Sequence, residues 1–304
     1  MNHDKTIAPQ SPLADTPQPP RTRRSARDEL NFLLTNRLPR HALTIGFGYL
    51  SRWRHPWFAK AAIALWRRCS DLDLSDAQPT RYDSLHACFT RALVPGARTV
   101  DADPAVMASP CDAIVGQCGA VDGTRAFQAK GYPYDIGELF GSADAAAPWR
   151  DGCYATLRLT ASMYHRFHAP HDGAIEHVTY LGGDVWNVNP PALARVAKLY
   201  CRNERAVIRT RIGAARHPVA LVPVAAILVA SIRLHAIDTR LHLRHAGANE
   251  IDCDARFEKG DELGWFEHGS TIIVFAPRGF ELAPGIAPGT RLRMGQALMR
   301  LPEA

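Results

Sequence analysis

Two hydrophobic patterns divide the chain. Up to about residue 98 the texture is helical, and the segment HPWFAKAAIALWRRC places Pro56 near a helix start and basic residues at the helix end. From about residue 100, CYATLRLT, SIRLH and RLHLR alternate apolar with polar positions, whereas TIIVFA is a continuous apolar run typical of a buried strand. Glycine and proline recur between these stretches. The patterns predict an α+β protein in which N-terminal helices pack on a β-rich domain with bent, twisted sheets.

Three further segments refine this prediction. YDIGELFG predicts a single helical turn inside the β-rich part. The most apolar run, residues 219–232, is about 14 residues long, short of the roughly 20 that a membrane-spanning helix needs. We interpret this run as a buried strand with Pro223 at an edge or a bend. Residues 1–28 are rich in proline and polar residues and lack the apolar core of a signal peptide, which predicts a disordered tail.

Composition limits the classes of protein that fit. The chain has 304 residues, 46% of them hydrophobic, which is enough to bury a sizeable core. Lysine and arginine number 36 against 30 acidic residues, a mild excess compatible with an anionic membrane surface, with nucleic acid or with neither. The seven cysteines are scattered singly, which argues against a disulfide framework or a zinc knuckle. Together with the N-terminal composition, they predict a reducing cytosolic compartment.

The helical segment mixes aromatic and basic side chains. These are Trp53, Trp57, Phe58 and Trp66, interleaved with Arg52, Arg54, Lys60, Arg67 and Arg68. Such a mixture is typical of helices that lie in a membrane interface, and it is also common on helices that pack against their own domain. From the residues alone, packing is the commoner explanation.

Candidate chemistry is concentrated in three stretches, the first of which is TASMYHRFHAPHDG. It places His165, His168 and His171 three residues apart. A metal site is one interpretation, because histidine is the commonest ligand. However, three-residue spacing alternates between the faces of an extended chain, and no acidic or cysteine partner stands nearby at a standard spacing. We therefore expect no metal here.

The other two stretches supply an aspartate and a serine. Asp112 lies in an SPCD turn before strand-like residues, where turn aspartates usually bond their own backbone. Gly269 and Ser270 stand before the apolar run that begins at Thr271, and a glycine at the mouth of a strand marks a bulge, a bend or close backbone approach. Serine, histidine and aspartate can form a nucleophile, its base and the group that orients the base. No Gly-x-Ser-x-Gly elbow surrounds Ser270, so an α/β-hydrolase is not indicated.

Taken together, these stretches resemble the phosphatidylserine decarboxylase proenzyme family, from about residue 43 to the C-terminal region. The resemblance rests on CFTRAL, SPCDAIVGQ with FQAKGYPY, YHRFHAPHDG, WNVNP, CRNERAV and EKGDELGWFEHGSTIIVF. Any one of these would be weak, but their occurrence in this order is specific. Residues 1–28 have no recognised counterpart.

The resemblance implies self-cleavage between Gly269 and Ser270. The Ser270 hydroxyl would attack the Gly269 carbonyl to form an ester, and elimination would leave dehydroalanine, which becomes an imine and hydrolyses to a pyruvoyl group with loss of ammonia. The products would be a β chain of residues 1–269 and an α chain of residues 270–304. We then expect a tail 1–28, a helical membrane-interface segment 29–98 and a β-rich catalytic domain 99–304.

The resemblance also implies roles for the other candidates. His168 matches the family histidine that acts as the base on the serine, and Asp112 matches the aspartate that orients it. His165 matches a histidine implicated in decarboxylation or proton delivery. The covalent pyruvoyl cofactor would form a Schiff base with the serine headgroup, and its carbonyl would accept the electron pair released as CO2 leaves. The product would be phosphatidylethanolamine.

The implied partners are a lipid and the cleaved chains. We expect phosphatidylserine in the membrane as substrate, the α and β chains as a heterodimer, and no nucleic acid; dimers of such heterodimers are known in the family. The aromatic and basic helices become credible membrane-interface elements, which implies a peripheral protein at the cytoplasmic face of the cell membrane.

Two alternatives stay open, and two positions depart from the family pattern. A serine hydrolase would use Ser270, His168 and Asp112 on an external ester or amide, and a lipid-binding homologue would keep the fold without maturing. The family commonly has Ala-Asp-Gly where this chain has Cys-Asp-Ala around Asp112. His268 stands before the glycine, where an apolar residue is common.

Overall fold

The computed structural model describes residues 29, 39–129, 132–227, 231–237, 240–242, 245, 247, 249–267 and 271–303. The predicted tail 1–28 and the junction residues His268, Gly269 and Ser270 lie outside the described residues. The helices are α2 (Arg40–Ser51), α3 (Pro56–Cys69), α4 (Leu85–Phe89), α5 (Ile136–Phe140), α6 (Ala143–Ala146), the 3-10 helix η1 (Ala147–Trp149), α7 (Pro190–Leu193) and α8 (Leu199–Arg202). The strands are β1 (Ala77–Gln78), β2 (Ala92–Leu93), β3 (Val106–Ala108), β4 (Ala113–Ala120), β5 (Arg125–Ala129), β6 (Tyr132–Asp135), β7 (Cys153–Arg158), β8 (Arg166–His168), β9 (Gly173–Leu181), β10 (Arg205–Ile212), β11 (His217–Val224), β12 (Ser231–Leu234), β13 (Arg240–His242), β14 (Glu250–Phe257), β15 (Glu262–Phe266), β16 (Thr271–Ala276), β17 (Glu281–Leu282), β18 (Arg291–Leu292) and β19 (Ala297–Arg300).

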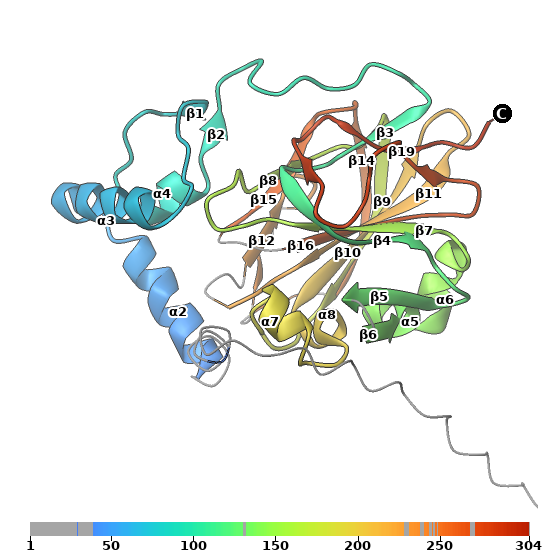
Figure 1. Cartoon of the computed structure of the whole chain (residues 1–304), viewed down its shortest axis with the longest axis horizontal. Helices are drawn as coiled ribbons and strands as arrows, with labels where there is room; N and C mark the ends of the chain where they lie inside the picture. Colours follow the sequence, from blue (N-terminus) through green and yellow to red (C-terminus); the bar gives the residue numbers. More distant parts are fainter. Residues whose placement is uncertain are drawn as a thin grey trace, which may run out of the picture.

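An antiparallel sheet of eight strands forms the middle layer, in the order β14-β9-β10-β11-β16-β7-β4-β18. One of its faces shares a hydrophobic core with the four-stranded sheet β13-β12-β15-β8. Its other face shares a second core with α5 to α8 and the hairpin β5-β6 (Figure 1). The predicted α+β class with a β-rich domain is confirmed, as is the short helix within YDIGELFG, which is α5.

Strand β16 explains the continuous apolar run TIIVFA. All six of its residues are buried. Because successive side chains of a strand point to opposite faces, Ile272 and Val274 enter the core between the two sheets, whereas Ile273 and Phe275 enter the core under the helices. With no face toward water, the strand has no polar position to alternate with.

The apolar run 219–232 divides between two sheets, so its interpretation as one strand is wrong. β11 belongs to the eight-stranded sheet, β12 belongs to the four-stranded sheet, and residues 228–230 between them lie outside the described residues. Pro223 pairs with Ile272 of β16, but it lies where the β10–β11 register has no recorded pair, between Arg205–Val224 and Ile208–Leu221. The pairs on both sides keep the same register, so the missing proline N–H interrupts the pairing without shifting it. The expectation that Pro223 stands at an edge is wrong, because β11 lies between β10 and β16.

The segments with candidate chemistry meet at one end of the strands of the large sheet. At this end, one row of paired residues runs across five neighbouring strands and consists of Arg205, Val224, Thr271, Arg158 and Ile114. The junction precedes Thr271 in the chain, and the SPCD turn precedes Ile114. Antiparallel pairing thus gathers segments that are far apart in sequence.

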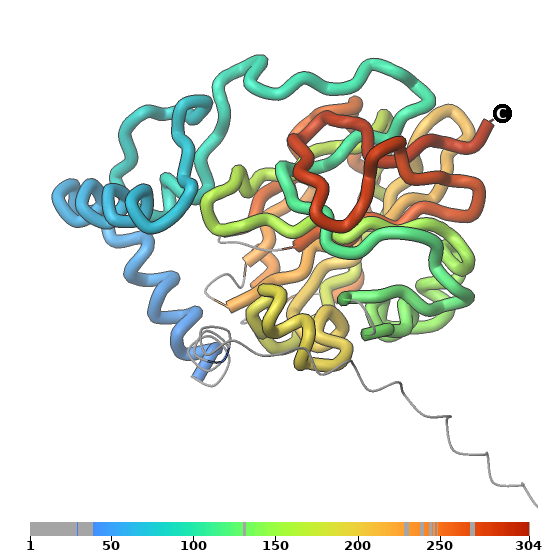
Figure 2. Tube along the Cα trace, in the orientation of Figure 1, coloured from blue at the N-terminus to red at the C-terminus, as the bar shows by residue number. Residues whose placement is uncertain are grey.

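Helices α2 and α3 lie at one side of the β domain, and the C-terminal residues lie toward the opposite side (Figures 1 and 2). Helix α3 begins at Pro56 and carries Arg67 and Arg68 in its last turn, as predicted. The Arg40 guanidinium holds α2 against the domain, because it lies 3.7 Å from the Trp186 ring centroid and pairs with Asp184.

Gly173, at the start of β9, has no room for a side chain. A Cβ there would lie 2.2 Å from the carbonyl oxygen of Arg211 in β10, whereas a Cβ on Gly182 would meet nothing within 4 Å. We expect Gly173→Ala to lower the free energy of unfolding by about 2–4 kcal/mol, and Gly182→Ala to change it by less than about 0.5 kcal/mol. Urea unfolding in a Ser270→Ala background, where a single chain unfolds, measures both. Equal stability of the two variants would contradict the predicted clash.

Candidate active site

His168 is a neutral imidazole with both ring nitrogens engaged. Its Nδ1 lies 2.8 Å from the carbonyl oxygen of Gly260, and its Nε2 lies 2.9 Å from the Tyr164 hydroxyl. Since a carbonyl can only accept, Nδ1 carries the proton and Nε2 accepts from Tyr164. Burial lowers the pKa of His168, and the bond to Gly260 opposes that shift. The structure therefore holds this histidine as a neutral acceptor.

Asp112 forms its strongest contact with Arg98, which the sequence did not single out. The Arg98 guanidinium donates from Nε to Oδ1 at 2.9 Å and from its terminal nitrogen to Oδ2 at 2.6 Å, and the Met294 amide donates to Oδ1 at 2.8 Å. The His168 amide donates to the Pro110 carbonyl at 2.7 Å, so β8 runs beside the turn that carries Asp112. Asp112 and His168 make no hydrogen bond with each other in the described part of the chain. The orienting role of Asp112 therefore stays a prediction.

A cavity of about 420 Å³ opens onto Asp112 and Tyr164. Its wall mixes acidic and basic side chains, among them Asp71, Asp73, Asp76, Arg91, Arg98, Arg291 and Arg293. The predicted aspartate and the tyrosine that binds His168 thus face one polar space. This cavity gives the candidate site access to solvent.

His165 is completely buried and has an unusual environment for a histidine. Its ring lies 4.0 Å, centroid to centroid, from the Phe89 ring, and neither ring nitrogen makes a hydrogen bond of normal geometry with the described residues. Burial, reinforced by the positive charge of Arg91, lowers the pKa of His165 to about 3. The ring is therefore neutral at any physiological pH. Its carbonyl accepts from the Phe266 amide at 3.0 Å, which places His165 beside the end of β15.

The two described ends of the junction belong to different sheets. Glu267 follows β15 of the four-stranded sheet, and Thr271 begins β16 of the eight-stranded sheet; both are buried. Sheets packed face to face lie about 10 Å apart, so the chain crosses between them in the three residues that lie outside the described part. Along this ladder His165 is the nearer histidine, since His168 pairs with Glu262 at the other end of β15.

Glu204 carries a buried carboxyl group at the same end of the large sheet's strands as the junction. The Ala225 amide donates to its backbone carbonyl, which fixes it beside the end of β11. Neither carboxyl oxygen accepts a hydrogen bond of normal geometry from the described residues; the nearby Tyr180 hydroxyl donates instead to the His242 carbonyl at 2.8 Å. Burial raises the pKa of Glu204 to about 7. This group is poised to change charge near neutral pH.

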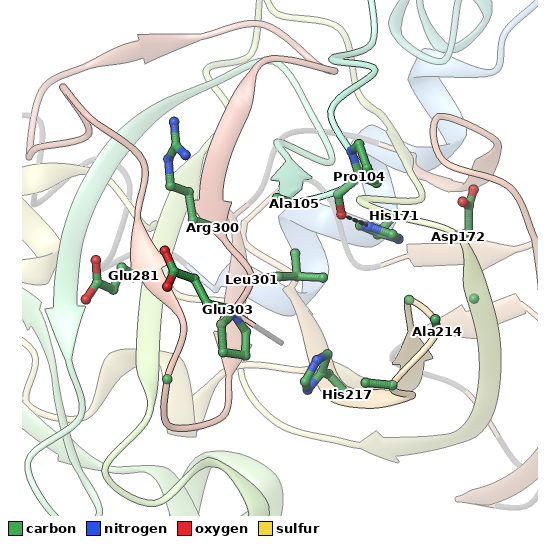
Figure 3. A pocket seen from close by; sticks show the side chains of 15 residues that line it. Pro104, Ala105, His171, Asp172, Ala214, His217, Glu281, Arg300, Leu301 and Glu303 are labelled. Carbon is green, nitrogen blue, oxygen red and sulfur yellow. Dashed lines mark hydrogen bonds between the residues drawn. The ribbon is translucent and has the colours of Figure 1, made fainter.

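The third histidine of the motif lies elsewhere. His171 faces a cleft of about 900 Å³ at the opposite ends of the strands, and its Nε2 lies 2.9 Å from the Pro104 carbonyl oxygen (Figure 3). The wall of this cleft also includes Gly213, in the turn after β10, and His217, the first residue of β11. Among the described residues, no group of three histidine, cysteine or acidic side chains is arranged to hold a metal ion.

Comparisons with known proteins decide the family. A family model described as phosphatidylserine decarboxylase matches residues 85–300, and a phosphatidylserine decarboxylase proenzyme of Pseudomonas fluorescens is 38% identical over 278 residues, covering 88% of this chain and 96% of that protein. The chain belongs to the phosphatidylserine decarboxylase family. A proenzyme of the same name from Xanthomonas axonopodis pv. citri is 39% identical over 240 residues, covering 75% of this chain and 84% of that protein. The resemblance inferred from the motifs is confirmed.

Sequence reasoning missed several polar residues of this phosphatidylserine decarboxylase family member. Tyr164 stands inside the motif that drew attention to the histidines, so its proximity to His168 could have been suspected. Glu204 stands inside the CRNERAV motif, but nothing there indicated that its carboxyl group is buried, and Arg98 gave no signal because its partner is remote in the chain. A charged residue beside Arg205 reads as solvent-exposed, yet Glu204 is completely buried.

Glu204 predicts a measurable dependence of stability on pH. Its pKa rises from 4.5 unfolded to about 7 folded, so its contribution to stability is fully present below pH 4.5 and is lost as the pH rises through 7. At 1.36 kcal/mol per unit, the loss reaches about 3 kcal/mol by pH 8. We expect Glu204→Gln to remove this loss, so that urea unfolding in the Ser270→Ala background shows wild-type Glu204 weakening from pH 5 to pH 8 relative to the variant. Parallel pH dependences would exclude the assignment.

Proposed function

We propose that this protein is a self-processing phosphatidylserine decarboxylase, which converts phosphatidylserine to phosphatidylethanolamine and CO2. The observation that carries the proposal is the position of the junction, whose ends Glu267 and Thr271 enter from two sheets beside a buried, neutral His165. The family match supports the substrate and the reaction, since the relatives carry this name. Cleavage between Gly269 and Ser270 and the pyruvoyl group are parts of the proposal.

The described surroundings fit a small group rich in carbonyl oxygens. The two ring nitrogens of His165 and the Thr271 hydroxyl are buried beside the junction without hydrogen bonds of normal geometry to the described residues. The neutral His165 ring offers one N–H donor and one acceptor, and the Thr271 hydroxyl offers a second donor. Buried polar groups of this kind are costly unless another group satisfies them. A pyruvoyl group at position 270 would supply an electron-accepting carbonyl that takes up the electron pair released as the carboxylate leaves as CO2.

For processing, we assign the proton-accepting role to His168. Its Nε2 already carries a lone pair at neutral pH, because its pKa is lowered and its proton sits on Nδ1. To take the Ser270 proton, Nε2 must exchange the Tyr164 hydroxyl for the serine hydroxyl or receive the proton through Tyr164. Asp112 lies on the same cavity wall as Tyr164, where its carboxylate favours a positive charge on His168.

For turnover, we assign His165 to the reacting carbon. Burial and the Phe89 ring keep its surroundings apolar, and its lowered pKa keeps the imidazole uncharged. Apolar surroundings favour loss of a carboxylate as neutral CO2, because they solvate the product better than the ion. The charge of buried Arg91, which helps to lower the pKa of His165, acts against this effect. The neutral imidazole can then hold or move the proton that replaces CO2.

The heterodimer part of the proposal rests on sheet pairing. β16 begins the α chain, yet it pairs with β11 on one side and β7 on the other, both from the β chain. Strands β18 and β19 pair with β4 and β3 of the β chain. Cutting one peptide bond leaves all these ladders and the core around them intact, so the fragments stay together.

We assign membrane docking to α2 and α3. Tyr49 of α2, Trp53 of the connection to α3, and Trp57 and Leu65 of α3 are 54–78% exposed, and Arg54 stands beside Trp53 in the connection. Exposed aromatic and aliphatic side chains next to cationic ones bind the interface of an anionic bilayer. No described helix is long and apolar enough to cross a membrane. We therefore propose peripheral binding at the cytoplasmic face of the cell membrane.

The cleavage chemistry is tested by the mass of the C-terminal fragment. We expect purified protein to yield residues 1–269 and a fragment of residues 270–304 that begins with a pyruvoyl group, whereas Ser270→Ala stays a single chain without CO2 release. His168→Ala and Asp112→Asn are expected to leave mostly precursor. CO2 release from phosphatidylserine by Ser270→Ala would refute the mechanism. An uncut wild-type chain labelled by a serine-reactive phosphonate would indicate a hydrolase.

His165 is tested by separating processing from turnover. We expect His165→Ala to be cleaved normally but to release CO2 about 10²- to 10⁴-fold more slowly, the usual contribution of a positioned acid or base. Gel analysis measures cleavage and radiolabelled CO2 measures turnover. His171→Ala, in the distant cleft, is the matched control and should retain turnover. An unprocessed His165→Ala would move this residue from turnover to maturation.

A further inference from the structure

Three arginines surround the carboxylate of Glu267, the last described residue before the junction. Arg52, at the end of α2, donates to Oε2 of Glu267, and Arg240 of β13 donates to Oε1 at 2.7 Å. Arg233 of β12 places its Nε 4.0 Å from Oε1. Within the described part of the chain, Glu267 is the only carboxylate that pairs with these arginines. The arginine cluster, defined as Arg52, Arg233 and Arg240, therefore carries two positive charges in excess of Glu267.

The neighbouring histidine does not alter this balance. His86 of α4 places its Nε2 4.0 Å from Oε1 of Glu267. Burial, followed by the charge of Arg52, lowers the pKa of His86 to about 4, so it is neutral at pH 7. Burial opposes ionisation of Glu267, but Arg52 and Arg240 outweigh it and keep the pKa of that carboxyl below its ordinary value. The excess charge thus belongs to the guanidinium groups.

The arginine cluster can receive a further anion. The side chains of Arg52, Arg233 and Arg240 are each about one third exposed. The Nε atoms of Arg233 and Arg240 are buried and make no hydrogen bond of normal geometry with the described residues. The buried Nε atoms are not open to solvent, so an incoming anion would meet the exposed parts of these side chains and their excess charge. Guanidinium groups bind phosphate oxygens with good geometry, which favours an anionic ligand.

Helix α4 relates the arginine cluster to His165. His86 approaches Glu267, and Phe89 lies against the His165 ring. His86 and Phe89 are three residues apart and therefore neighbours on the helix surface, which places the arginine cluster and His165 near one face of α4. The chain supplies a second link, because the Phe266 amide donates to the His165 carbonyl at 3.0 Å and Glu267 is the next residue. In a phosphatidylserine headgroup, one methylene separates the ester oxygen of the phosphate from the carbon that bears the amine and the carboxylate, so the two groups must be bound close together.

We propose that the arginine cluster binds the phosphate of the substrate phospholipid while the serine moiety lies at His165. This inference rests on the proposed function, because it assigns the reacting carbon to His165. The phosphate, and not the carboxylate, is the group held, since guanidinium groups around the carboxylate would stabilise the ion that must be lost. Arg52 caps α2, so the cluster lies next to the exposed side chains of Tyr49 in α2 and Trp53 just after it, which we assign to the membrane interface.

The test compares headgroup fragments with and without the phosphate. We expect Arg233→Gln and Arg240→Gln to be processed into two fragments, but to turn over phosphatidylserine in mixed micelles with kcat/KM reduced about 10- to 100-fold, the value of one lost charge-assisted hydrogen bond. Binding of glycerophosphoserine, measured by calorimetry, should weaken by a similar factor. Binding of O-methylserine, which keeps the amine and the carboxylate, should not change.

The matched control is Arg278→Gln. Arg278 is 77% exposed, pairs with Asp151 at 2.9 Å and follows the end of β16 that is remote from the junction. It should retain wild-type turnover and binding of both fragments. Arg233→Lys, which keeps the charge but loses the planar fork, should fall between wild type and Arg233→Gln.

Other outcomes would overturn the inference. If the cluster served only as a general attractant for anionic bilayers, the glutamine variants would bind phosphatidylglycerol vesicles poorly and glycerophosphoserine normally. If it served only to support Glu267, the glutamine variants would lose binding of O-methylserine as well. Failure of the wild type to release CO2 would remove the proposed function, and glycerophosphoserine binding would still test the cluster directly.

Discussion

The placement of β16 between β11 and β7 is the constraint on which the rest of the structure depends. Both ladders run through Thr271, so the first described residue after the junction is fixed at a central position of the large sheet. The side chains of β16 are buried on both faces of the sheet, so removing this strand would cost a large hydrophobic free energy. Glu267 is fixed to the other sheet, since its amide donates to the Ser231 carbonyl. The two described ends of the junction are thus each fixed by backbone pairing to a different sheet.

Burial acts differently on the ionisable groups around this junction. His165 and His168 are driven toward their neutral forms, and Glu204 is driven toward its protonated form. Asp112 and Glu267 instead keep arginine partners, which compensate the loss of hydration. The region around the junction thus contains neutral ionisable side chains next to fixed ion pairs. Glu204 can exchange its proton near pH 7, the His165 ring stays neutral there, and the ion pairs provide a constant field.

How far the sequence could predict this arrangement depends on whether each feature is local. The helix beginning at Pro56 and the buried strand TIIVFA follow from adjacent residues, and both predictions are confirmed. The run 219–232 was misassigned, because periodicity cannot tell where an apolar chain leaves one sheet for another. The motifs identified the family, but the partners of Asp112 and Glu267 could not be predicted. They come from segments distant in the sequence: Arg98 from the connection between β2 and β3, Arg52 from the end of α2, and Arg240 from β13.

The separation between neutral and charged groups suits a reaction in which one charge is lost and another persists. A phosphodiester keeps its charge throughout decarboxylation, so binding it with guanidinium groups stabilises substrate and transition state alike. The carboxylate loses its charge as CO2 forms, so any cation that solvates it in the ground state raises the barrier. The Phe89 ring supplies an apolar contact at His165, and the arginine cluster lies near the same face of α4, an arrangement that serves both requirements. Because electrostatic interactions are stronger in a buried site than in water, a displacement of one cation from the cluster toward His165 would oppose the reaction it now assists.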